Sequence, residues 1–145
     1  MADKDRKYKL YKTIQFLMIS LTLKKLSAMN IEELREYCLS KKGVTESFPF
    51  DETTLVFKVI GKMFALTDTE DEFSINLKCD PEKAIELREK YPAVQPGYHM
   101  NKKHWNTIYV DGSVSDEKLK GWIDDSYWLI TNSLPKKDRI KLGLI

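Results

Sequence analysis

Residues 54–78 of the chain read TLVFKVIGKMFALTDTEDEFSINLK, and their pattern indicates a β-sheet at the centre of the protein. It contains three runs in which side chains at every second position are apolar, a pattern typical of half-buried strands. The first run extends from Leu55 to Val59, a turn at Gly61 leads to the second, and an acidic turn over residues 69–72 leads to the third. Short turns between such runs predict an antiparallel meander of three strands.

Capping residues and apolar spacing predict three helices around this meander. Asn30 caps the first helix, Asp80 and the following proline open the second, and Ser115 caps the third. A glycine at the end of the first helix and prolines after the other two are the expected stop signals. The predicted helices cover residues 31–42, 81–91 and 115–134.

Two further strands are predicted after the second helix. A short strand lies near Val94, and a longer one covers residues 106–110 before a turn at Asp111-Gly112. The element order is therefore helix, three strands, helix, two strands, helix. Pairing of the late strands with the meander predicts an α+β fold, a two-layer sandwich in which an antiparallel five-stranded sheet carries its helices on one face.

The composition excludes several classes of protein. A chain of 145 residues with 42% hydrophobic and 32% charged side chains fits one globular domain, and neither a disordered chain nor a membrane bundle. Two cysteines, Cys38 and Cys79, are too few and too far apart for a disulfide framework or a zinc site. We expect both to be buried thiols of a protein in a reducing compartment, the cytoplasm.

Residues 1–28 differ from the rest of the chain in charge. They carry seven basic and two acidic side chains, a net charge of +5, whereas residues 29–145 have a net charge of −3. An apolar run over 13–23 is similar to the core of a secretory signal, but Lys24 and Lys25 follow it directly. The run is also shorter than the roughly 20 residues that span a membrane. We interpret 1–28 as an extension before a single domain over 29–145; a docked amphipathic helix and a signal peptide are the alternatives.

Residues 95–108, QPGYHMNKKHWNTI, followed by residues 115–135, resemble the signature of the MmcQ/YjbR family. The resemblance extends over residues 29–140 and leaves out the N-terminal extension. It implies a two-layer α/β sandwich of order α-β(3)-α-β(2)-α, which matches the order predicted above. It also implies a bacterial protein that binds DNA through a double-wing motif and has no established enzymatic activity. Further agreement lies in residues 48–50, 58–64 and 74–78 and in Asp80-Pro81.

The segment before the last strand holds the one compact group of basic and aromatic residues in the sequence after residue 28. Lysines contact phosphates, aromatic rings stack on bases, and asparagine reads base edges. A buried Trp105 and a solvated pair of lysines are the competing interpretation, and a second basic stretch over 136–141 offers another phosphate contact. The candidate nucleic-acid contacts are Lys62, Tyr98, His99, Asn101, Lys102, Lys103, His104, Trp105 and Asn106.

Charge also provides an argument against DNA binding. The predicted turn over residues 69–72 is strongly acidic and repels phosphate if it serves as a wing. The tight hairpin around Gly61 is the one that carries a basic tip, at Lys62. Because residues 29–145 have a net charge of −3, we expect modest affinity that depends strongly on salt.

Enzymatic chemistry is not expected. His99 and His104 are five residues apart with no third metal ligand close in sequence, and neither a glycine-rich phosphate loop nor a nucleophile elbow occurs. The sequence therefore predicts no catalytic residues, no metal and no cofactor. The alternative function is a protein- or small-ligand-binding module that uses the open face of the sheet. We expect a monomer whose partner is DNA or, in that alternative, a protein, and no membrane contact. The open-face residues are predicted to be Thr54, Val56, Lys58, Phe64 and Leu66.

Overall fold

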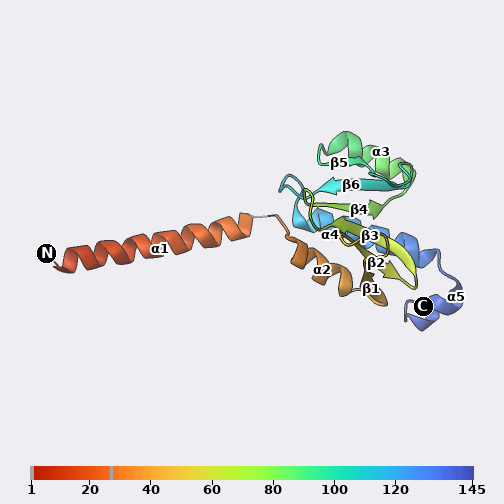
Figure 1. Cartoon of the computed structure of the whole chain (residues 1–145), viewed down its shortest axis with the longest axis horizontal. Helices are drawn as coiled ribbons and strands as arrows, with labels where there is room; N and C mark the ends of the chain where they lie inside the picture. The colour runs from red at the N-terminus through yellow and green to blue at the C-terminus, as the bar shows by residue number, and fades with distance from the viewer. Residues whose placement is uncertain (1, 27) are drawn as a thin grey trace.

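The computed structural model describes residues 2–26 and 28–145 and contains one open antiparallel sheet of six strands (Figure 1). The strands lie in the order β1-β2-β3-β4-β6-β5, and every neighbouring pair is antiparallel. The predicted three-stranded meander is confirmed as β2, β3 and β4. The strands are β1 (Val44–Ser47), β2 (Thr54–Val59), β3 (Lys62–Asp68), β4 (Ser74–Lys78), β5 (Val94–Pro96) and β6 (Trp105–Tyr109).

The predicted count of five strands is wrong, because the sequence pattern does not mark β1 as a strand. Its four residues, VTES, contain one apolar side chain and therefore lack the alternation that marks a strand. β1 pairs with β2, with Val44 opposite Val59 and Ser47 opposite Val56. Strand formation here is a consequence of that long-range pairing and not of local propensity.

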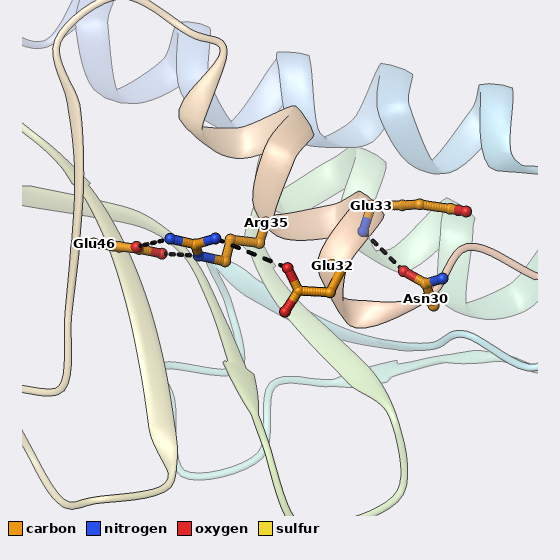
Figure 2. Close-up of polar contacts among 5 residues, drawn as sticks. All are labelled: Asn30, Glu32, Glu33, Arg35 and Glu46. Carbon is orange, nitrogen blue, oxygen red and sulfur yellow. Dashed lines mark hydrogen bonds and ion pairs between the residues drawn. The ribbon is translucent and has the colours of Figure 1, made fainter.

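An ion pair fixes β1 to the helical layer (Figure 2). The Arg35 guanidinium, on α2, donates through Nε and Nη2 to the two carboxylate oxygens of Glu46 on β1, at 2.7 and 2.5 Å. Glu32 lies 3.8 Å from the same guanidinium. At the start of α2, the side chain of Asn30 accepts from the backbone N–H of Glu33 at 2.9 Å, which confirms the predicted cap.

Three helices cover one face of the sheet, as predicted. Their apolar side chains, such as Leu34, Leu87 and Ile123, pack with the inward side chains of the strands in one core cluster. Asp80 and Ser115 cap the second and third of these helices, also as predicted. The short helix α5 forms where the sequence indicated only a basic stretch. The helices after residue 28 are α2 (Ile31–Leu39), α3 (Pro81–Lys90), α4 (Asp116–Asn132) and α5 (Lys136–Lys141).

A β-bulge in the first hairpin changes which side chains face the helices. The β2–β3 register shifts between Phe57 and Lys58, so that Phe64 has no direct partner on β2. Phe64 is fully buried and lies edge-on against Tyr127 of α4, with ring centroids 5.5 Å apart. Its backbone carbonyl accepts from the hydroxyl of Ser126. The prediction of Phe64 on the open face is therefore wrong, because strict alternation cannot anticipate a bulge.

Helix α1 (Ala2–Leu26) projects away from the sheet and its helices (Figure 1). Large apolar side chains along it are exposed, for example Leu10, Ile14 and Phe16 at 60%, 48% and 72%. Within the residues that the structure describes, no helix is long and apolar enough to cross a membrane. The domain boundary at residue 29 stays a prediction.

Candidate nucleic-acid interface

The candidate interface is centred on the loop of residues 97–104, which joins β5 to β6 and folds back on β6. Gly97 donates its N–H to the carbonyl of Trp105 at 2.9 Å, and Trp105 donates to the carbonyl of Asn101 at 3.0 Å. A Cβ at residue 97 would lie 2.8 Å from the Cβ of Trp105 and 2.9 Å from its carbonyl oxygen. The loop needs glycine here because its backbone approaches the strand too closely for a side chain.

The loop is anchored on the sheet face that points away from the helices. The backbone N–H of Tyr98 donates to the hydroxyl of Thr107 at 3.0 Å, and that hydroxyl donates to the side-chain carbonyl of Asn76. Met100 packs on a small apolar cluster that is separate from the main core. This second cluster contains Val56, Leu66 and Trp105, with Met63 and Met100 against it.

Arg88 holds the loop from the other side of β6. It lies in the last turn of α3, and its Nε donates to the side-chain carbonyl of Asn106 at 2.7 Å. Its Nη2 donates to the backbone carbonyls of Trp105, at 3.2 Å, and Lys102. One guanidinium therefore fixes both ends of the segment that carries the two lysines.

The structure separates the predicted contact residues into exposed and buried groups. His104 is half-buried, and Trp105 and Asn106 are buried, at 8% and 1% exposed. Asn106 is engaged by Arg88 and also donates to the carbonyl of Ala84, so its amide is not available to a base edge. The exposed members of the loop are Tyr98, His99, Asn101, Lys102 and Lys103.

Tyr98 and His99 form a pair of exposed rings at the turn of the loop. Their centroids lie 4.0 Å apart with the ring planes at 50°, and Tyr98 is 70% exposed. His99 has a φ of +58°, a left-handed conformation that is uncommon outside glycine. The two rings thus present a polarisable surface to solvent, and hydrogen bonds fix the backbone of the loop that carries them.

Lys62 lies at the same end of the sheet as this loop. Met63, its neighbour, packs on the same cluster as Met100, and Cys79 at the end of β4 donates its N–H to the carbonyl of His104 at 2.8 Å. Of the described non-glycine residues, only Ile60 and His99 have positive φ, and both lie in the turns at this end. Such strained positions concentrate at functional sites.

The acidic turn predicted to repel phosphate lies at the opposite end of the sheet. Residues 69–72 connect β3 to β4, beyond the pairs Thr54–Asp68 and Ser74–Tyr109. The hairpin tip at Lys62 and the start of β6 lie at the other end of these strands. The two turns of opposite charge are therefore separated by the length of the strands, and the electrostatic objection to a basic contact surface is weakened.

The second basic stretch, in α5, lies near the β1 edge. Leu142 packs closely on Gly43, and Lys42 donates to the carbonyl of Gly143 at 3.4 Å. Strands β2, β3 and β4 lie between β1 and β6 in the sheet. The loop and α5 thus belong to the two flanks of the molecule, with the Lys62 hairpin between them.

Neither cysteine is among the exposed residues of this surface, although Cys79 adjoins the loop through its backbone bond to His104. Cys38 is fully buried on α2, and burial raises the pKa of its thiol to about 12. Cys79 is half-buried, and burial raises its pKa as well. Neither forms a disulfide. Among residues 2–26 and 28–145, no three His, Cys, Asp or Glu side chains come together as metal ligands.

Comparison with known proteins identifies the family. A family model described as YjbR matches residues 39–129, a segment that contains all six strands and the 97–104 loop. The chain belongs to the YjbR family. Among YjbR relatives, the chain is 38% identical over 112 residues to the uncharacterized protein YjbR of Escherichia coli K12, covering 77% of this chain and 95% of that protein. It is also 38% identical over 109 residues to the uncharacterized protein YbdF of Escherichia coli O157:H7, covering 74% and 89%.

Solved structures support the YjbR fold. The crystal structure of the Deinococcus radiodurans protein DR2400 is similar with a TM-score of 0.75 and 42% sequence identity, covering 80% of this chain and 89% of that one. A crystal structure from Pseudomonas syringae gives a TM-score of 0.62 at 28% identity, covering 70% and 98%. The resemblance inferred from residues 95–108 is therefore confirmed.

Proposed function

We propose that this YjbR-family chain is a non-enzymatic DNA-binding protein that contacts nucleic acid through the 97–104 loop and the Lys62 hairpin. The observation that carries the proposal is that Lys102, Lys103 and Tyr98 are all exposed on one loop, which Arg88 and Thr107 fix to the sheet. Phosphate contacts from lysine and stacking of aromatic rings on bases are two recurring components of nucleic-acid binding. Because the loop is already fixed before binding, it loses less conformational entropy when it binds a ligand.

The alternative module, which uses the open sheet face for a protein or small ligand, has less support. Two of its central apolar residues, Val56 and Leu66, are 0% and 7% exposed. They are covered by Met63 and by Met100 of the loop itself. An open face that the chain already fills offers little apolar area to a partner.

The salt dependence of binding tests the proposal. Changing Lys102 and Lys103 to Ala removes two phosphate contacts, so the slope of log affinity against log salt should become shallower by about 2 units. The matched control changes Lys118 and Lys120, two exposed lysines of α4 on the helical layer, and should leave the slope unchanged. Fluorescence anisotropy with labelled oligonucleotides across a salt series gives both slopes.

Three outcomes decide the matter. A shallower slope of log affinity against log salt in the Lys102/Lys103 variant, but not in the control, supports the proposal. Equal loss in both variants indicates diffuse attraction to the whole chain and contradicts a site at the loop. Absence of binding at low salt, where attraction to phosphate is strongest, overturns DNA binding and favours the open-face module.

A further inference from the structure

Tyr98 has an exposed ring on a backbone that cannot easily move. Its ring is 70% exposed, while its N–H is bonded to Thr107 on β6 and its neighbour Gly97 is bonded to Trp105. The His99 ring packs against it with centroids 4.0 Å apart, and the partly buried Met100 packs the loop on the cluster that contains buried Trp105. An aromatic side chain kept in water on a rigid support loses little conformational freedom when it binds a flat ligand.

The face of a nucleobase is the flat ligand that suits such a ring. In a duplex, both faces of each internal base are covered by the neighbouring base pairs, so a tyrosine reaches one only if the duplex is unstacked, which costs free energy. In a single strand the base faces are accessible, and base–aromatic stacking tolerates any sequence. Lys102 and Lys103 are exposed in the same loop as Tyr98, and lysine side chains contact the phosphates of nucleic acids.

We infer that the ligand of this loop is single-stranded nucleic acid, with one unstacked base against Tyr98 and its backbone phosphates near Lys102 and Lys103. The inference rests on the proposed function and narrows it from nucleic acid in general to strands whose bases are accessible. DNA and RNA single strands share this chemistry, because stacking does not involve the sugar.

The test compares Tyr98→Ala and Tyr98→Phe on three probes, a short fluorescein-labelled oligothymidine, the matching oligouridine and a DNA duplex of the same length. Tyr98→Ala should weaken single-strand binding by about 5- to 150-fold, the usual loss for one stacked base, and leave the salt slope unchanged. Tyr98→Phe keeps the ring and should stay within about twofold of the parent. Neither variant should change duplex binding.

A matched control uses Phe50, another exposed aromatic residue, at 65%, in the connection between β1 and β2. Phe50→Ala removes similar apolar area away from the loop and should not alter binding to any probe. Thermal unfolding of each variant verifies that the fold is retained, which is expected because the anchoring bonds of Tyr98 come from its backbone.

The outcomes separate this inference from the proposed function. If the duplex binds as tightly as the single strands, or Tyr98→Ala has no effect, the single-strand inference fails. The proposed function still stands in that case, provided that the Lys102/Lys103 variant has the shallower slope. Lack of binding to all three probes at low salt overturns both. If either single strand binds more tightly than the duplex, the inference is supported. The difference in affinity between oligouridine and oligothymidine then shows which single strand is preferred.

Discussion

The guanidinium of Arg88 donates through Nε to the side-chain carbonyl of Asn106 at 2.7 Å, joining the end of α3 to β6. Asn106 is 1% exposed, so this contact satisfies a polar group that water does not reach. The second nitrogen of the same guanidinium extends to the backbone of Lys102. Arg88 thereby fixes the backbone of the segment that carries Lys102 and Lys103.

Replacing Arg88 with Ala should destabilise the protein and weaken nucleic-acid binding together. The buried carbonyl of Asn106 would lose its donor, which costs about 1–3 kcal/mol. The affinity of the protein for single strands and for duplex should fall, because Arg88 would no longer fix the backbone of Lys102. Urea unfolding and anisotropy measure the two effects. The control variant Lys90→Ala also removes one positive charge from the exposed end of α3 and should change stability and affinity only slightly. Equal effects of Arg88→Ala and Lys90→Ala would contradict a positioning role for Arg88.

The Arg35–Glu46 pair should contribute to stability in a pH-dependent manner. The hydrogen bonds that the Glu46 carboxylate accepts from Arg35 hold the pKa of Glu46 below its ordinary value. The contribution is therefore present above the ordinary glutamate pKa and is lost as pH falls through the lowered value. Glu46→Gln should lower Tm by a few degrees at neutral pH, and the difference from the parent should shrink in acid. Thermal melts across acidic pH check this; Glu70→Gln, in the exposed acidic turn, is the charge-matched control. A constant difference at every pH would be inconsistent with the ion pair.

The two thiols should differ in reactivity. Cys38 is fully buried, with a pKa raised to about 12, so very little thiolate is present near neutral pH. Cys79 is half-buried, and its raised pKa also limits the thiolate. We expect slow labelling of both by a thiol reagent, with Cys79 the faster, and rapid labelling in denaturant. Fast native labelling of Cys38 would show that α2 opens readily.

Deleting residues 1–28 should leave the rest of the chain folded. The apolar side chains described on α1, such as Leu10 and Phe16, are exposed and contribute little to the core. Met29, by contrast, is 2% exposed, and its N–H donates to Asp116 at 3.1 Å, so it should be kept. Thermal melts should agree within a few degrees, and size-exclusion chromatography should give one peak for the shortened chain. Loss of cooperative unfolding would assign α1 to the domain.

Local sequence patterns predicted the helices and the meander because capping residues and alternation act over a few residues. Strand β1 was missed since its residues carry one apolar side chain and it depends on pairing with β2 and on the contact between Arg35 and Glu46. The burial of Phe64 was missed because a bulge shifts the register there. Helix α5 was missed because its segment carries mainly charged side chains.

The candidate loop was predictable as a group of residue types, but not as an arrangement. Trp105 is buried in the second apolar cluster, where Met100 of the loop packs on it. Asn106 is buried on the opposite side of β6, where its side chain bonds to Arg88 and Ala84 of α3. Arg88 gave no signal beyond being a basic residue in the last turn of a helix, where such residues are common. Its partners lie 14 to 18 residues away, and only the packing of α3 against β6 brings them together.

The strands at the two ends of the sheet are short, and this length has a consequence for self-association. β1 has four residues and β5 has three, the last of which is Pro96, a residue without an N–H to donate. A ladder between two molecules needs a row of free donors and acceptors, and brief, interrupted edges provide few. The short edge strands thus protect the six-stranded sheet against edge-to-edge pairing with other molecules and against growth into fibrils.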